Sequence, residues 1–136
     1  MRPIRRAACS CGRLQITAEG EPQRVSICHC LECQRRTGSA FGIAARFPRA
    51  QTSVSGDSRV YERVSDQGEG RTFHFCPECG TTVFWTTAAS PELVAIAVGA
   101  FADPSFPAPA ASFFETQRHH WLALPETIEH HERFRT

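Results

Sequence analysis

Short stretches in which apolar and polar residues alternate recur along most of this 136-residue chain. Alternation with a period of two places one set of side chains on one face of a β-strand. These stretches, together with some continuous apolar runs, lie at residues 14–18, 25–27, 41–47, 60–61, 73–75, 83–85, 93–98, 113–114 and 121–122. Because Gly, Pro, Asp and Ser separate them, the pattern predicts a mainly β domain of short strands joined by turns.

One segment favours a helix instead. We expect a short helix at residues 31–37 that ends at Gly38, because glycine readily adopts the left-handed conformation found at helix C-termini. The nine prolines argue against long helices. We therefore expect few, short helices, and we expect the two tryptophans, Trp85 and Trp121, and the ten phenylalanines to lie mostly in the core.

The length predicts a single domain over residues 1–136. The formal net charge of +1 is not typical of a nucleic-acid-binding protein, so we expect no nucleic-acid partner. All fifteen basic residues are arginine. Arginine is better suited than lysine to hold a carboxylate through two parallel hydrogen bonds.

The chain also lacks the apolar segments that membranes require. No apolar run approaches the roughly 18 residues of a membrane span. Residues 1–6 resemble the basic start of a signal peptide, but residues 9–13 stand where its apolar segment should follow. We therefore expect a cytoplasmic protein without a membrane partner. In a reducing compartment, closely spaced cysteines indicate metal ligands rather than disulfides.

The candidate chemistry lies in seven cysteines that form three clusters. The clusters are Cys9-Ser-Cys11, Cys28-His-Cys30-Leu-Glu-Cys33 and Cys76-Pro-Glu-Cys79. A structural zinc site usually has four ligands, whereas a catalytic site has three and an exchangeable fourth. Seven sulfur atoms divide naturally into four and three. This division suggests two zinc ions per chain, one in a closed structural site and one open to chemistry.

Cys76 and Cys79 have the spacing of a zinc knuckle, which needs two further ligands. Cys9 and Cys11 are the simplest source, because residues i and i+2 of an extended segment point the same way. The alternative is that some of these cysteines are buried free thiols, which behave as small hydrophobic residues. Spacing alone does not establish which doublet pairs with which.

Cys28 and Cys30 share one side of an extended segment, and Cys33 lies about one helical turn beyond Cys30. The three sulfur atoms can therefore converge on one ion and leave a fourth position for water or a substrate thiol. Two alternatives remain open. A protein side chain such as His74 fills the fourth position, or the three thiols form a metal-free redox cluster.

Two arginines follow this cluster. Arg35 and Arg36 are candidate ligands for a substrate carboxylate, although a solvated helix face is an equal alternative. His29 should point away from its neighbouring cysteines. The pairs His119-His120 and His130-His131 are expected on the surface.

These motifs together resemble those of the glutathione-dependent formaldehyde-activating enzyme family, which includes centromere protein V. The matching residues are Cys9-Ser-Cys11-Gly12, Cys28-His-Cys30-x-x-Cys33-x-Arg35-x-Thr37-Gly38-Ser39-Ala40 and Phe75-Cys76-Pro-x-Cys79-Gly80-Thr81. The likeness extends from about Cys9 to Trp121. This chain has Ser112 where a histidine is frequent in the family.

The resemblance implies a fold of several curled antiparallel β-sheets, a β-tent like that of a zinc-containing Rab chaperone. It implies a structural zinc at Cys9, Cys11, Cys76 and Cys79, and a catalytic zinc at Cys28, Cys30 and Cys33. Because three-ligand sites can lose their metal, we expect the catalytic zinc to be the labile one. The implied activity is a carbon–sulfur lyase that condenses formaldehyde with glutathione to S-(hydroxymethyl)glutathione. A zinc-stabilised binding module for a thiol metabolite or a protein partner is the alternative, and a redox thiol sensor is a third hypothesis.

Overall fold

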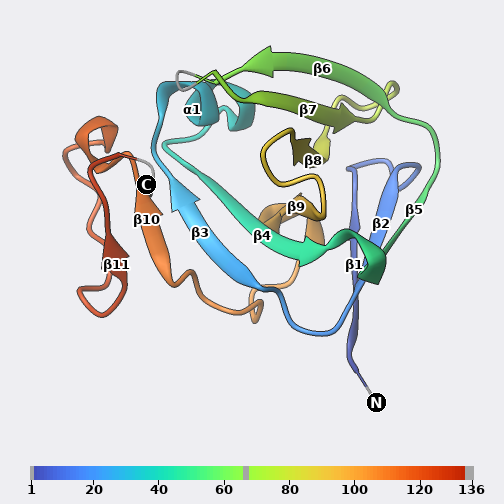
Figure 1. Ribbon diagram of the computed structural model, residues 1–136, viewed down its shortest axis with the longest axis horizontal. Helices are drawn as coiled ribbons and strands as arrows, with labels where there is room; N and C mark the ends of the chain where they lie inside the picture. The colour runs from blue at the N-terminus through green and yellow to red at the C-terminus, as the bar shows by residue number, and fades with distance from the viewer. Residues whose placement is uncertain (1, 66–67, 134–136) are drawn as a thin grey trace. The chain divides into compact units, whose positions relative to one another are not determined.

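The structure of the chain is a computed structural model that describes residues 2–65 and 68–133 (Figure 1). Strands dominate it, and α1 (Leu31–Thr37) is the single α-helix of the described residues. The predicted mainly β fold is therefore confirmed. By internal contacts the chain divides into two compact units, Met1–Gln23 with Ala45–Phe106 and Arg24–Ala44 with Pro107–Thr136. Strand β4 (Gly42–Pro48) begins in the second unit and ends in the first.

A three-stranded antiparallel sheet in the first unit has the order β1-β2-β5. Its strands are β1 (Ile4–Ala8), β2 (Gln15–Glu19) and β5 (Thr52–Ser55). Ile16 is fully buried and Ala18 nearly so, as the alternation in residues 14–18 predicted. After β5, Gly56 has a φ of +91°, and a side chain there would collide with the backbone carbonyl of Arg13. Only glycine fits this close approach.

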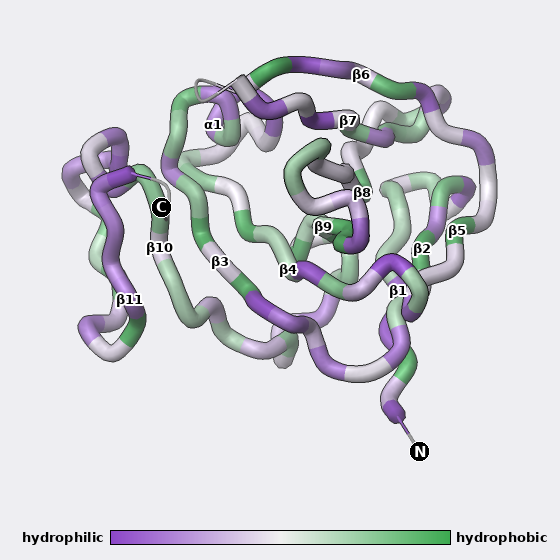
Figure 2. Tube along the Cα trace, viewed as in Figure 1, coloured by the Kyte–Doolittle hydropathy of each residue, from purple (hydrophilic) through white to green (hydrophobic). Residues whose placement is uncertain are grey.

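The other strands of the first unit follow one another as an antiparallel series. They are β6 (Arg59–Val64), β7 (Gly70–Phe75), β8 (Thr82–Thr87) and β9 (Leu93–Ala97). In β9, Val94, Ala95 and Ile96 are all buried, which confirms the buried strand predicted at residues 93–98. Strand β6 is more polar, and Figure 2 shows hydrophilic residues in its middle. The 3-10 turns η1 (Arg49–Gln51) and η2 (Val98–Phe101) complete this unit.

The second unit adds parallel strand pairs to the antiparallel sheets that the resemblance implied. Strand β10 (Ala111–Phe113) pairs in parallel with both β3 (Arg24–Cys28) and β11 (Glu129–His130). Figure 1 shows β3, β10 and β11 side by side, and η3 (Glu115–Gln117) follows β10. The register places Phe113 opposite Cys28, so β10 ends beside the start of the second cysteine cluster.

Helix α1 has the bounds that the sequence predicted. Cys30 caps its N-terminus, since the Cys30 sulfur accepts a hydrogen bond from the backbone N–H of Cys33. At the other end Gly38 has a φ of 65° and donates its N–H to the carbonyl of Gln34, as expected for a C-terminal glycine. Within residues 2–65 and 68–133, no helix has the length and apolar character needed to cross a lipid bilayer.

One aromatic prediction is wrong. Trp121 is 63% exposed, whereas Trp85 and several phenylalanines are buried in the core as expected. Trp121 lies outside the strands, and its indole contacts the ring of His119 edge-on, with 5.9 Å between ring centroids. The strand predicted at residues 121–122 does not form, and Trp121 lies in a turn instead.

Candidate metal centres

The structure gathers the cysteine sulfur atoms into two groups, with four in one and three in the other. The four-sulfur group consists of Cys9, Cys11, Cys76 and Cys79, all in the first unit. The three-sulfur group consists of Cys28, Cys30 and Cys33, all in the second unit. Within each group the sulfur atoms lie within 4.8 Å of one another, which suits a single metal ion. Neither group includes a histidine among the described residues.

A tight loop after β1 positions the first pair of the four-sulfur group. The backbone N–H of Cys9 donates to the carbonyl of Leu14 at 2.9 Å, and the N–H of Gly12 donates back to the carbonyl of Cys9 at 3.0 Å. The N–H of Leu14 also donates to the Cys9 sulfur at 3.2 Å. The loop therefore turns polar donors toward the sulfur atom and holds Cys9 and Cys11 with their sulfurs 3.6 Å apart.

A loop of the same kind between β7 and β8 positions the second pair. The N–H of Cys76 donates to the carbonyl of Thr81, and the N–H of Gly80 donates to the carbonyl of Cys76. The N–H of Glu78 points at the Cys76 sulfur at 3.4 Å. Gly80 has a φ of 80°, a conformation that glycine adopts without strain. This is the knuckle geometry that the Cys-x-x-Cys-Gly spacing predicted.

The protonation of these thiols indicates what the four-sulfur group can bind. Hydrogen bonds from Thr81 lower the pKa of Cys79 to about 5. A backbone hydrogen bond near Arg13 favours the thiolate of Cys11, but desolvation and the neighbouring sulfurs, Cys76 first, raise its pKa to about 11. Four adjacent thiols cannot all ionise without a nearby positive charge. A divalent cation supplies that charge, and a closed set of four thiolates is the donor set of structural zinc.

The three-sulfur group is built from one contiguous stretch. Cys28 is the last residue of β3, Cys30 caps α1, and Cys33 lies in the first turn of the helix. All three side chains are half-buried. Hydrogen bonding to Cys30 and Cys33, together with burial, raises the pKa of Cys28 far above its ordinary value. A hydrogen bond from Cys28 lowers the pKa of Cys33, but contact with Cys30 and burial raise it overall. These thiols, too, need a cation in order to ionise together.

The residue between the first two of these cysteines is anchored in the interior. His29 is fully buried, and its Nε2 lies 2.9 Å from the hydroxyl of Ser112. The Ser112 hydroxyl also hydrogen bonds to the carboxylate of Glu115, which lies 2.7 Å from Nδ1 of His130. A hydroxyl that donates to Glu115 accepts from His29, so His29 carries its proton on Nε2. Burial lowers the pKa of His29, which keeps the ring neutral.

Backbone and amide contacts fix the same stretch to the segment after β10. The N–H of His29 donates to the carbonyl of Phe113 at 3.0 Å. Gln117 accepts from the N–H of Leu31, and the Gln34 amide donates to the carbonyls of His29 and Gln117. These contacts hold β3 and the start of α1 at fixed positions, so the three sulfur atoms keep their spacing without a second loop.

The two candidate arginines differ in their surroundings. Arg35 is 72% exposed and forms an ion pair with Glu32 at 2.7 Å. Arg36 is less exposed, and after the hydrogen bond from Cys28 its positive charge is a smaller influence that limits the overall rise in the pKa of Cys33. A side chain at Gly42 would meet the Arg36 guanidinium, so glycine there leaves room for it. Arg36 is therefore the arginine whose charge acts on the three-sulfur group, while Arg35 is turned to Glu32.

The remaining histidines take no part in either group. His74 hydrogen bonds to Ser58 at 2.9 Å and stacks on Phe84, with 4.4 Å between ring centroids. The pairs at 119–120 and 130–131 lie mostly at the surface, as predicted. Sequence reasoning missed the supporting roles of Thr81 and Gln117 and noticed Ser112 only as a departure from the family. The supporting role of Thr81 could have been inferred from its position directly after Cys-x-x-Cys-Gly. No local pattern in the sequence indicates the role of Gln117.

The sequence that builds this geometry matches one known protein family. A family model described as glutathione-dependent formaldehyde-activating enzyme matches residues 4–117. The chain belongs to this family. The match spans both sulfur groups, from β1 to the segment that supports His29.

Solved structures support the fold. The crystal structure of a Rhodobacter sphaeroides protein aligns with a TM-score of 0.52 and 22% sequence identity. The alignment covers 70% of this chain and 85% of that chain. At this identity the likeness concerns the fold alone. The search of curated proteins found no match.

Proposed function

We propose that this chain is a zinc-dependent carbon–sulfur lyase of the formaldehyde-activating family, which condenses glutathione with formaldehyde. The observation that carries the proposal is the division of seven sulfur atoms into a closed group of four and an open group of three. The family model names both substrates. In this proposal the four-sulfur group holds a structural zinc, and the three-sulfur group holds a labile, catalytic one. We further propose that residues 1–136 act as one domain in the cytoplasm.

The proposed reaction needs only an addition. The substrate sulfur forms one bond to the carbonyl carbon of the aldehyde, and the carbonyl oxygen takes up a proton, so no oxidant or reductant is required. A zinc ion held by three thiolates supplies an open coordination position and lowers the pKa of a thiol that binds there. The reverse reaction cleaves the same bond, which is why the activity is that of a lyase.

The chain's own residues would set the geometry of this centre. Cys28, Cys30 and Cys33 would be the metal ligands, and the hydrogen bonds of His29 to Ser112 and Phe113 keep the first two in place. Neighbours that orient metal ligands commonly change metal affinity 10- to 100-fold when they are removed. Arg36 supplies positive charge beside Cys33 and is better placed than Arg35 to hold a substrate carboxylate, because Glu32 already pairs with Arg35.

The decisive experiment measures zinc per chain on protein purified without chelator, with and without glutathione. We expect two zinc ions, with glutathione changing the exchange rate of only the labile one. Exchange spectroscopy by NMR then measures S-(hydroxymethyl)glutathione formation above the uncatalysed background. Cys33→Ser should lose one zinc and reduce the catalysed rate by more than about a hundredfold, since it removes a ligand rather than a supporting residue.

Two matched variants test the substrate contact. Arg36→Gln should raise the KM for glutathione and keep both zinc ions, whereas Arg35→Gln should change little. A single zinc that glutathione never affects, in protein whose three-sulfur group cannot be loaded with added zinc, would contradict the catalytic role. That result would favour a zinc-stabilised binding module for a thiol metabolite or a protein partner.

A further inference from the structure

Strand β6 lies at the end of the antiparallel series β9-β8-β7-β6, and within the described residues β7 is its only strand neighbour. Antiparallel strands exchange hydrogen bonds through alternate residues, so every second backbone N–H and C=O of β6 points away from β7. An open row of such groups can pair with a strand of another chain. The outer edge of β6 is therefore a candidate interaction surface.

The side chains of β6 are both apolar and charged. Val60, Tyr61 and Val64 are 52%, 58% and 68% exposed, so half of this six-residue strand consists of exposed large hydrophobic side chains. The charged side chains nearby are also available. Asp57, which stands just before the strand, and Arg59 within it are exposed and form no ion pair within the described part of the chain. Their charges remain free for a partner.

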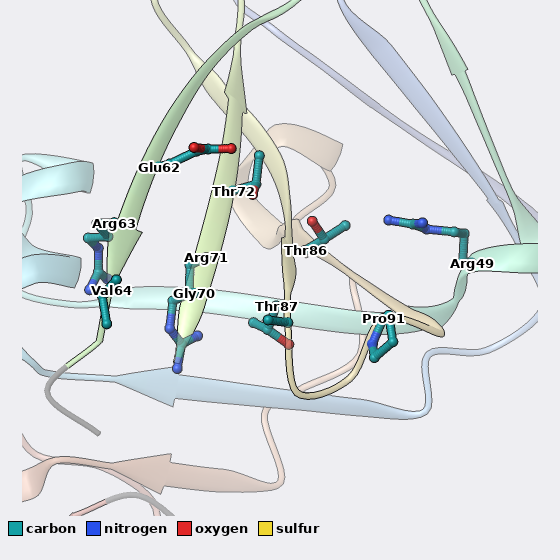
Figure 3. Close-up of a pocket in the computed structure, with 11 residues that line it drawn as sticks. Arg49, Glu62, Arg63, Val64, Gly70, Arg71, Thr72, Thr86, Thr87 and Pro91 are labelled. Atoms are coloured by element: carbon teal, nitrogen blue, oxygen red, sulfur yellow. The ribbon is translucent and has the colours of Figure 1, made fainter. Parts of the chain in front are cut away.

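The register with β7 shows which side chains of β6 share a face. Tyr61 lies opposite Phe73, and the guanidinium of Arg63 lies over the Phe73 ring, 5.1 Å from its centroid. Side chains alternate along a strand. The odd-numbered residues of β6 therefore share the face of Phe73, and the even-numbered residues lie on the other face. Figure 3 shows the side chains of Glu62 and Arg63 extending to opposite sides of β6.

Charge limits the registers in which β6 could pair with a second copy of itself. In a two-fold symmetric antiparallel pair, one residue lies opposite its own copy. Arg59, Glu62 or Arg63 at this central position would place like charges directly opposite each other, which destabilises the pair. Tyr61 at the centre would place Arg59 opposite Arg63. Val64 is the last residue of β6, so a centre there would leave most of both strands unpaired.

A centre at Val60 gives a complementary register instead. Val60 then meets its own copy, and Arg59 lies opposite Tyr61 on both sides of the two-fold axis. Further out, Asp57 of each copy lies opposite Arg63 of the other. Opposite charges, and a cation beside an aromatic ring, both favour cross-strand pairs. The pattern of β6 thus complements its own reverse.

We propose that the chain forms a two-fold symmetric dimer in which β6 pairs with β6 of a second copy, centred on Val60. The pairing would give hydrogen-bond partners to the outward backbone groups and would cover the exposed Val60 and Tyr61. A second copy fits better than an unrelated strand because its charges match those of β6 in this register. The interface is independent of the proposed lyase activity, since its residues are distinct from both cysteine groups.

Analytical ultracentrifugation of the zinc-loaded chain over a range of concentrations tests the proposal. We expect a reversible equilibrium between monomer and dimer. Val60→Lys places two positive charges at the two-fold axis and should raise the dissociation constant of the dimer by about tenfold or more. Val54→Lys is the matched control and should leave the dissociation constant unchanged. Val54 is 49% exposed and lies on β5, the strand at one end of the three-stranded sheet.

A charge exchange tests the register itself. Asp57→Arg should weaken the dimer because it places like charges opposite each other, and adding Arg63→Asp to it should restore the dimer. In the unaltered protein, amide hydrogen exchange in residues 59–64 should slow as the concentration rises, while exchange in residues 52–55 stays constant.

Three results would overturn the proposal. The first is a protein that stays monomeric at every concentration. The second is a dimer that Val54→Lys disrupts and Val60→Lys does not. The third is a double variant, Asp57→Arg with Arg63→Asp, that dimerises no more tightly than Asp57→Arg alone.

Discussion

Ser10 and His29 occupy the same place in two Cys-x-Cys doublets, but their surroundings are opposite. Ser10 stands between Cys9 and Cys11, is exposed, and pairs with the hydroxyl of Thr81 at 3.1 Å. His29 stands between Cys28 and Cys30, is fully buried, and pairs with Ser112 at 2.9 Å. The two doublets therefore place their sulfur atoms by different means.

In the four-sulfur group, the chain positions its ligands by bringing two distant loops together. The Cys11 and Cys76 sulfurs are 3.6 Å apart, although the residues are 65 positions apart in sequence. In the three-sulfur group, six consecutive residues carry all the ligands, and the buried His29 between Cys28 and Cys30 anchors them to β10 and the segment after it. A metal in the first group would close a long loop and stabilise the fold, whereas a metal in the second would change stability less and remain available for chemistry.

The largest predicted effect follows from that difference. Cys76→Ser should lower the free energy of unfolding by more than about 4 kcal/mol, because it removes a ligand that joins two distant segments. Cys33→Ser should lower the free energy of unfolding by less than about 2 kcal/mol, since the ligands of the three-sulfur group are already neighbours along the chain. Urea denaturation of both variants, with zinc measured in each, provides the comparison. Equal losses of stability would show that the two groups contribute alike.

A smaller effect is expected from the side chains that flank the ligands. Ser112→Ala leaves the buried Nε2–H of His29 without its acceptor and should cost about 1–3 kcal/mol. It should also weaken zinc binding at the three-sulfur group by roughly tenfold. Ser10→Ala is the matched change in the other doublet and should stay within about 0.5 kcal/mol, because its hydrogen bond is exposed. Thermal denaturation and competition with a zinc chelator measure the two quantities.

If Ser10→Ala proved as costly as Ser112→Ala, burial would not be what separates the two doublets. Ser112→Thr, which keeps the hydroxyl, is the further control and should recover most of the zinc affinity.

The smallest effect is a pH dependence in the segment that supports His29. The hydrogen bond to Glu115 raises the pKa of His130 above its ordinary value near 6.5. The contribution of His130 to stability is therefore complete below the pKa that His130 has in the unfolded chain. This contribution is lost as the pH rises through the pKa of His130 in the folded chain. Burial alone would raise the pKa of Glu115, but hydrogen bonds to Ser112 and His130 lower it. The contribution of Glu115 is present above its unfolded pKa and is lost as the pH falls through the folded one.

NMR titration of the His130 ring checks this. Glu115→Gln should return the pKa of His130 toward its ordinary value and leave the four-sulfur group unchanged. An unaltered His130 titration in this variant would contradict the assigned cause.

Local features of the sequence predicted much of this structure. Elements that depend only on neighbouring residues could be predicted. These include the helix at residues 31–37 with its terminal Gly38 and the buried strand at residues 93–98. Strand β1 was missed, because Arg5 and Arg6 hide its alternation and the segment resembles the start of a signal peptide. The division of cysteines into four and three matches the geometry, although their role as zinc ligands stays a prediction.

Features that depend on distant residues could not be predicted in the same way. The parallel pairing of β10 with β3 joins residues more than 80 positions apart, and no short pattern encodes its direction. The partner of His29 is likewise distant in sequence. The exposed Trp121 was wrongly assigned to the core because side-chain size alone does not decide burial.

The contiguity of Cys28, Cys30 and Cys33 has a consequence for the order of events during synthesis. All three thiols leave the ribosome before Cys76 and Cys79 exist, so the nascent chain presents a complete local set while Cys9 and Cys11 still lack their partners. Ser112 and Gln117, which fix the neighbours of that set, are made later than every cysteine. Cys28, Cys30 and Cys33 are thus the first thiols that could bind a metal as a complete set. They are also the last for which all the supporting residues have been synthesised.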